Sequence, residues 1–203
     1  STRLIGGLIM VHGDDQGLRL PPNIAPIQVV IIPISKTDEG LTNVESYLSD
    51  LISSFEDKGI RYLLDKREKI SPGFKFNEWE MKGVPIRIEV GPRDLEGGGV
   101  MVARRDTGDK KSVSIDDAPD AIASLLEDIQ DTLFKQALEF RESNTFTATG
   151  YDEFKQLIEN GGFVEAGWDG TGETEDSIKK ETKATIRCIL DDVIADDLQC
   201  IYS

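Results

Sequence analysis

Blocks of apolar and polar residues predict alternating strands and helices along the first two thirds of the chain. Residues 27–34 are β-branched and almost wholly apolar, which is typical of a central strand buried on both faces. From Asn43, apolar residues recur at the spacing of an amphipathic helix, with Asn43 as its N-cap and Gly59 at its end. A short second strand is expected at residues 60–64.

The next elements continue the alternation. Ser71-Pro72 predicts the start of a helix over residues 73–82, because proline is favoured at the first helical position. Residues 84–90 alternate apolar and polar, which predicts a strand with one wet face. Two more strands are expected at 100–105 and 112–115, followed by a long helix capped by Asp117. Together these elements predict an open α/β sheet of about five strands, flanked by helices, over residues 23–143.

The last third reads as a second, small α+β unit. Helices are expected at residues 151–160 and 175–182, strands at 163–166 and 184–189, and a polar loop at 167–175. At the other end, the apolar run 4–11 leads into a polar turn and then a proline-rich linker that no helix can cross. Because a domain rarely begins inside an apolar segment, we expect the chain to be a fragment of a longer protein.

Composition narrows the class of protein. The chain has 203 residues, of which 38% are hydrophobic and 30% charged, and this balance suits packed cores rather than a low-complexity chain. The longest apolar run, at 27–34, is far too short to span a bilayer, so no membrane partner is expected. Two cysteines argue against a secreted disulfide scaffold and suggest a cytoplasmic location. The net charge of −15 would argue against a nucleic-acid partner.

The charge is unevenly distributed, which changes that last conclusion. Residues 61–113 hold 12 of the 23 Lys and Arg residues against nine Asp and Glu, a net of +3. Residues 114–203 hold seven against 21, a net of −14. Because screening limits the reach of a charge to about 8–10 Å, a basic surface on an acidic protein can still bind phosphates.

The basic segment also carries the most informative group of side chains. Aromatic residues and a carboxylate precede a strand with arginines, and further cations flank the next turn; the residues are Phe74, Phe76, Trp79, Glu80, Arg87, Arg93, Arg104, Arg105, Lys110 and Lys111. Aromatic rings stack on unpaired bases, cations contact phosphates and guanine acceptors, and a carboxylate accepts from guanine donors. The alternative is a solvated face with core aromatics, and composition alone does not separate the two.

A second candidate is the single histidine. His12 lies beside Asp14 and Asp15, a set that could bind a metal or form a catalytic pair. A polar turn after an apolar segment explains the same residues more simply, and the absence of a nearby nucleophile makes a hydrolase a poor alternative. No Gly-x-Ser-x-Gly, phosphate-loop or Cys-x-x-Cys motif is present, and Gly97-Gly98-Gly99 is expected to be a hairpin turn.

Specific motifs nevertheless resemble one family over essentially the whole chain. STRLIGGLIM (1–10) with HGDD (12–15) resembles motif 3 of the class II prolyl-tRNA synthetases, and GLRLPP (17–22) with APIQVV (25–30) resembles the junction that follows it. GVPIR (83–87), GPRDLE (91–96) and ARRDT (103–107) resemble the family's anticodon-binding domain. The C-terminal extension is similar to the archaeal/eukaryotic-like type, which lacks an inserted editing domain.

The resemblance implies three domains and a function. Residues 1–22 would be the tail of the class II catalytic domain, 23–143 a class IIa anticodon-binding domain with a mixed five-stranded sheet flanked by helices, and 144–203 a C-terminal domain. The full-length enzyme would be a cytoplasmic homodimer that uses ATP to attach proline to its tRNA. This portion would bind the tRNA and read its anticodon, and would be inactive alone, with no catalytic residues of its own.

The resemblance also implies residue roles. Arg3 would contact an ATP phosphate, while Glu80, Arg87 and Arg93 would read the two guanines shared by all proline anticodons. Phe76 and Lys110 are weaker candidates for the same surface. The alternative left open is a non-catalytic α/β interaction module that docks a protein partner through its acidic C-terminal unit.

One departure concerns zinc, which the family's C-terminal domain often binds through four cysteines. Asp169 stands where the first cysteine is expected, residues 171–175 supply no second, and Ser203 stands where Cys200-x-x-Cys would end. Cys188 does not fall on a ligand position of that pattern. Because a closed tetrahedral site needs four ligands, no zinc is expected.

Overall fold

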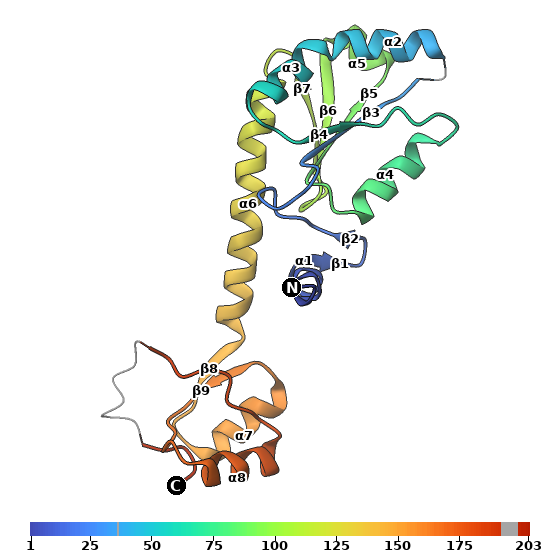
Figure 1. The fold of residues 1–203 in the computed structure, drawn as a ribbon. Coiled ribbons are helices and arrows are strands. Elements are labelled where there is room, and N and C mark those ends of the chain that lie inside the picture. The colour runs from blue at the N-terminus through green and yellow to red at the C-terminus, as the bar shows by residue number, and fades with distance from the viewer. Residues whose placement is uncertain (36, 192–198) are drawn as a thin grey trace. The chain divides into compact units, whose positions relative to one another are not determined.

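The computed structural model in Figure 1 describes residues 1–35, 37–191 and 199–203. The chain divides into two compact units, Ser1–Lys135 and Gln136–Ser203. Helix α6 (Ala118–Ser143) runs from the first unit into the second. Among the described residues, none of the helices combines the length and apolar character that crossing a membrane requires.

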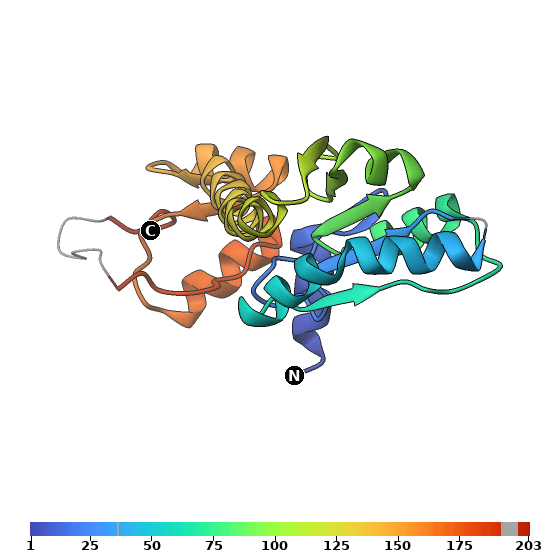
Figure 2. The same ribbon diagram turned by 90° about the horizontal axis from the view of Figure 1, so that it is seen from above.

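The first unit is built on a five-stranded mixed sheet. Its strand order is β4 (Tyr62–Leu64), β3 (Val29–Pro33), β5 (Ile86–Val90), β6 (Gly99–Arg104) and β7 (Lys110–Ser114). Strand β3 pairs in parallel with β4 and β5, whereas β6 and β7 continue the sheet in antiparallel pairs. The strands and their helices can be followed in Figures 1 and 2. The predicted mixed α/β sheet is therefore confirmed.

Each face of the sheet has its own apolar core. One face packs against helices α2 (Asp38–Tyr47) and α3 (Ser49–Asp57) and the first half of α6, through residues such as Ile31, Phe55 and Ile122. The other face packs against α4 (Pro72–Met81), where Val30, Ile32, Trp79 and Val84 form a smaller cluster. The smaller core leaves part of this second face for polar side chains.

The helix predicted from Asn43 to Gly59 is in fact two helices, and its predicted start is wrong. The first begins at Asp38, where the Thr37 hydroxyl accepts a hydrogen bond from the Gly40 N–H at 3.2 Å, and the two helices meet at Leu48. The predicted apolar stripe is correct, because Val44, Leu48, Leu51 and Phe55 are all buried. Such a stripe shows which face of a helix is buried. Because the apolar spacing continues through Leu48, it does not reveal that one helix ends there and another begins.

Two further predictions in the sheet domain are wrong. Strand β5 has no fully wet face, because α4 covers it: Arg87 is half-buried and Glu89 is buried. Gly97-Gly98-Gly99 is not a hairpin turn but the end of α5 (Pro92–Gly97), a helix that was not predicted. Gly98 adopts φ +66°, the left-handed conformation that ends helices.

The second unit consists of α7 (Tyr151–Asn160), α8 (Gly172–Thr182) and a parallel pair of short strands, β8 (Thr145–Thr147) and β9 (Phe163–Glu165). Helix α8 begins three residues earlier than predicted, at the Thr171 cap. The strand predicted at 184–189 is wrong, since residues 183–190 are neither helix nor strand. Its apolar residues Ile186 and Ile189 are exposed, and a strand needs a partner edge that this segment does not have.

The N-terminal segment belongs to the first unit. Helix α1 (Arg3–His12) leads into a small hairpin, β1 (Gly13–Asp14) and β2 (Gly17–Leu18). The helix has no buried residue, and its apolar side chains are largely exposed: Leu4, Ile5, Ile9, Met10 and Val11. Helix α1 therefore presents exposed apolar side chains at the surface of the first unit.

Candidate functional site

A row of residues across the sheet places two cations on one face. Arg87 of β5 pairs with Ala103 of β6, and Ala103 pairs in turn with Lys110 of β7. Directly paired residues on neighbouring strands point to the same side of a sheet. Because Ala103 is small, space remains between the two longer side chains. The sheet thus forms the floor of a polar cavity.

Helix α4 supplies the other wall of this cavity. Phe76 and Glu80 lie one helical turn apart, so their side chains occupy the same face of the helix. The guanidinium of Arg87 lies 4.6 Å from the centre of the Phe76 ring, and Lys110 Nζ lies 5.5 Å from it. The nearest carboxylate oxygen of Glu80 is 3.8 Å from Arg87 Nη1. The cavity has a volume of about 300 Å³ and includes Asn77 and Gly108 in its lining.

Glu89 is a residue of this cluster that the sequence analysis missed. One of its carboxylate oxygens accepts from Arg87 Nε at 3.0 Å and from Lys110 Nζ at 2.9 Å. The two-residue spacing from Arg87 in a strand was the available signal, because it places both side chains on one face. Glu89 therefore holds the two cations in place through its contacts with Arg87 Nε and Lys110 Nζ, and Arg87 Nη1 donates to the Phe76 carbonyl at 3.5 Å.

The arrangement suits a flat ligand with hydrogen-bonding edges. The Phe76 ring offers a stacking surface, the cations can donate to ring acceptors or phosphate, and the Glu80 carboxylate can accept from N–H groups. Guanine carries both acceptors and donors, so it can use all three kinds of group. The sequence-based hypothesis of an unpaired-base site therefore has a matching geometry at Phe76, Glu80, Arg87 and Lys110.

Several other cations and rings of the basic segment have partners of their own, although Trp79, Arg104 and Arg105 also line the cavity. Arg93 is exposed on α5, which follows the last residue of β5, whereas Arg87 lies near the first residue of that strand. Arg93 does not line the cavity. Trp79 is buried, and its Nε1 donates to Asp65 at 2.8 Å. Arg104 pairs with Asp106 and Asp128. These side chains show why residue type alone could not separate a binding surface from a packed one.

Asp65 fixes the inner side of α4. Its buried carboxylate accepts hydrogen bonds from Trp79 and from Arg67. Lys75 Nζ donates to the backbone carbonyl oxygen of Asp65 at 2.9 Å. Burial alone would raise the pKa of Asp65, but hydrogen bonds from Arg67 and Trp79 hold that pKa well below its ordinary value. Lys75 and Trp79 each precede a cavity residue, Phe76 and Glu80, so Asp65 anchors the helix that presents them.

In the His12 turn, the neighbouring Asp14 carboxylate is held by an arginine from a distant strand end. Burial and then the charge of Arg19 lower the pKa of His12, which favours the neutral ring. The Asp14 carboxylate is paired with Arg105. Within residues 1–35, 37–191 and 199–203, no group of three or more His, Cys, Asp or Glu side chains is placed to hold a metal ion. Arg3, the first residue of α1, is exposed.

The positions where the resemblance implies zinc carry a hydrogen-bonded cluster instead. The Asp169 carboxylate accepts from the Thr171 N–H and hydroxyl at 2.9 Å and from the Thr174 hydroxyl at 2.8 Å. Burial alone would raise the pKa of the Cys200 thiol, but hydrogen bonding with Ser203, Tyr202 and Asp169 lowers it. One thiol, one carboxylate and neutral hydroxyls are a poor donor set for Zn²⁺, so these residues do not fit a closed zinc site.

Comparison with known proteins gives two family matches and many close relatives. Residues 28–125 match the family described as "Anticodon binding domain", and residues 151–203 match "Prolyl-tRNA synthetase, C-terminal". "Proline--tRNA ligase" of Cytophaga hutchinsonii is 51% identical over 100% of this chain and 42% of its own length. The proteins of the same name from Porphyromonas gingivalis and Flavobacterium johnsoniae are each 50% identical, over 93% and 100% of this chain. The chain spans about two fifths of the length of these relatives.

Proposed function

The chain belongs to the prolyl-tRNA synthetase family, and we propose that its sheet domain binds the tRNA for proline and reads guanines of the anticodon. The observation that carries this proposal is the convergence of Phe76, Glu80, Arg87 and Lys110 on one cavity. Arg93, which is exposed on α5, would contact the same anticodon from outside that cavity. This role would explain how a protein of net charge −15 receives RNA through a locally basic domain.

The proposal extends to the longer protein to which this chain would belong. That protein would use ATP to attach proline to tRNA in the cytoplasm, as a homodimer. Residues 1–22 would be the tail of its catalytic domain, 23–143 the anticodon-binding domain and 144–203 the C-terminal domain. Arg3 would contact an ATP phosphate. The exposed apolar side chains of α1 support this division, because further parts of a catalytic domain would cover them.

The function is tested by filter binding with two RNAs at two salt concentrations. One RNA carries the proline anticodon, and in the control RNA its guanines are replaced. We expect tighter binding of the first RNA at both salt concentrations, with both affinities falling as salt rises. Equal affinity for the two RNAs would contradict base reading, and no binding of either would favour the protein-docking alternative.

We also propose that the C-terminal unit is stable without metal. The hydrogen bonds of Asp169 to Thr171 and Thr174 would join the loop at 169–171 to the start of α8, as metal coordination otherwise would. Purified protein is therefore expected to contain no stoichiometric zinc, and a chelator should leave its unfolding temperature unchanged. Thr174→Val should lower the stability of this unit by about 1 kcal/mol, because it removes the hydroxyl of a buried residue that donates to Asp169 and accepts from Thr171.

The matched control for that variant is Ser177→Ala. Ser177 lies on the same helix, and its exposed hydroxyl bonds only to the Glu173 carbonyl among the interactions described for it. This substitution should change the unfolding temperature little. One zinc per chain, or unfolding on chelation, would overturn the proposal.

A further inference from the structure

The buried side chain of Arg105 joins two distant segments of the first unit. Its two Nη atoms donate to the Asp14 carboxylate at 2.9 and 2.5 Å, and its Nε donates to the Glu80 carbonyl oxygen at 2.9 Å. Only 5% of the Arg105 side chain is exposed. A guanidinium that meets a carboxylate through two hydrogen bonds forms a strong and directional pair. We call these three groups the Arg105 junction.

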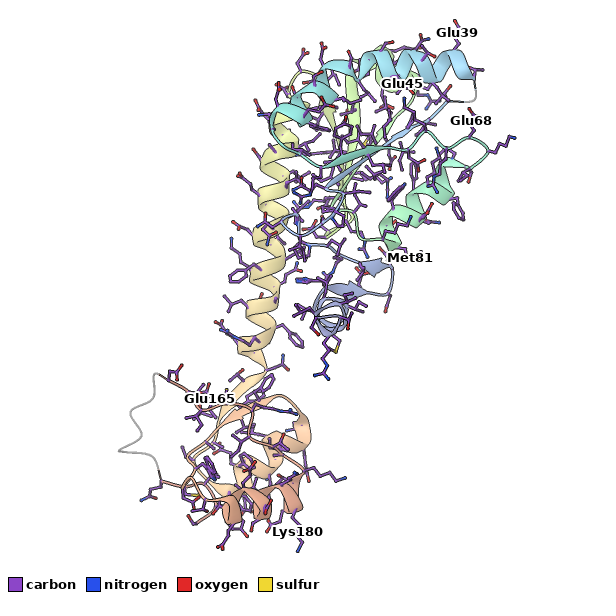
Figure 3. All side chains as sticks on the ribbon, viewed as in Figure 1. Glu39, Glu45, Glu68, Met81, Glu165 and Lys180 are labelled. Carbon is purple, nitrogen blue, oxygen red and sulfur yellow. The ribbon has the colours of Figure 1, made fainter. Side chains whose placement is uncertain are left out.

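Close backbone packing supports the junction. The Leu20 N–H donates to the Gly83 carbonyl at 3.1 Å. Gly17 and Gly83 both have positive φ, +133° and +76°, and a Cβ on Gly83 would lie 2.6 Å from the Leu18 side chain. A Cβ on Gly17 would collide with the backbone of Met81, which Figure 3 labels at the end of α4 above the hairpin. The β1–β2 hairpin is therefore fitted against the turn that links Glu80 to Arg87.

We propose that Arg105 and Asp14 are positioning residues for base reading: they hold the last turn of α4, and so the Glu80 carboxylate, in register with Arg87. This inference rests on the proposed function of the same cavity. Arg105 is one of the residues that line the cavity, whereas Asp14 belongs to the hairpin and does not line it, so Asp14 is linked to the cavity through its pair with Arg105. Recognition groups must be held to within about 0.5 Å, and hydrogen bonds from surrounding side chains supply that precision.

The Asp14 carboxylate of the junction is ionised at any pH near neutrality. A hydrogen bond from Arg105 is the largest effect on Asp14, whose pKa is lowered to about 2. Arg19 lies 3.8 Å from the same carboxylate. Neutralising Asp14 by substitution therefore removes a charge that is present under all ordinary binding conditions.

The experiment measures selectivity in the variants Asp14→Asn and Arg105→Lys. Selectivity is the ratio of the affinity for the proline-anticodon RNA to the affinity for its guanine-substituted control. We expect both variants to lose about five- to tenfold in selectivity, which corresponds to part of one charge-assisted hydrogen bond. Lysine keeps the charge but cannot present the planar fork of arginine. Asp15→Asn is the matched control, since it removes the same charge from the next residue, and it should keep wild-type selectivity.

Two comparisons separate positioning from a general loss of stability. Ile129→Val destabilises the buried core of the same unit and should leave selectivity unchanged. In a Glu80→Gln background, Asp14→Asn should have no further effect on selectivity, because its partner in recognition is already altered. Wild-type selectivity in Asp14→Asn would overturn the inference, whereas a wild-type protein without selectivity would overturn the proposed function itself.

Discussion

Replacing Arg87 by lysine is expected to reduce the preference for the guanine-bearing anticodon by about 30-fold, or about 2 kcal/mol. The physical reason is geometric, since arginine can donate two parallel hydrogen bonds to guanine and lysine cannot. Lysine keeps a positive charge beside Phe76 and Glu89, so the carboxylate of Glu89 is not left unpaired. Binding of the guanine-substituted RNA should therefore change little, and competition binding with the two RNAs measures the difference.

The matched control for Arg87 is Lys111. Lys111 follows Lys110 on the same strand, where successive side chains point to opposite faces, and it is exposed. Lys111→Ala should leave the preference for guanine unchanged, weaken the binding of both RNAs equally and reduce the salt dependence. An Arg87→Lys protein that keeps its preference for guanine would show that this cavity does not read the anticodon.

The elements of the fold were largely predictable because each depends on local sequence. The β-branched run before Pro33 and the stripe from Val44 to Phe55 record burial directly, and both segments are buried. The break at Leu48 and the helix α5 were missed, since a buried stripe continues across a break and a six-residue helix is shorter than two turns. The strand expected at 184–189 failed because pairing depends on a neighbour that local sequence does not specify.

The site was predictable only in part, for the same physical reason. Phe76, Glu80 and Arg87 are close in sequence, so their helix–strand context could place them together. Arg105 looked like another surface cation, but its partner Asp14 is 91 residues away, and no local pattern indicates such a pair. Tertiary contacts decide that Arg105 is buried and that Arg93 is exposed.

Asp65→Ala is expected to lower the free energy of unfolding of the first unit by about 3 kcal/mol. The substitution leaves Lys75 Nζ, whose side chain is 6% exposed, without its carboxylate partner, and leaves the buried Trp79 Nε1 without an acceptor. Because the pKa of folded Asp65 lies below its ordinary value of 3.8, its stabilisation is complete above that pH and is lost as the pH falls below it. The deficit of the variant should therefore be constant near neutrality and shrink in acid.

Urea unfolding followed by the fluorescence of Trp79 measures this loss, in a Trp168→Phe background that removes the only other tryptophan. Asp57→Ala, at an exposed position on α3, is the control and should change stability by no more than about 0.5 kcal/mol. Because Asp65 anchors the helix that carries Phe76 and Glu80, its loss should also reduce guanine selectivity under conditions where the variant remains folded. A variant as stable as the wild type would mean that the buried carboxylate is not what holds α4 against the sheet.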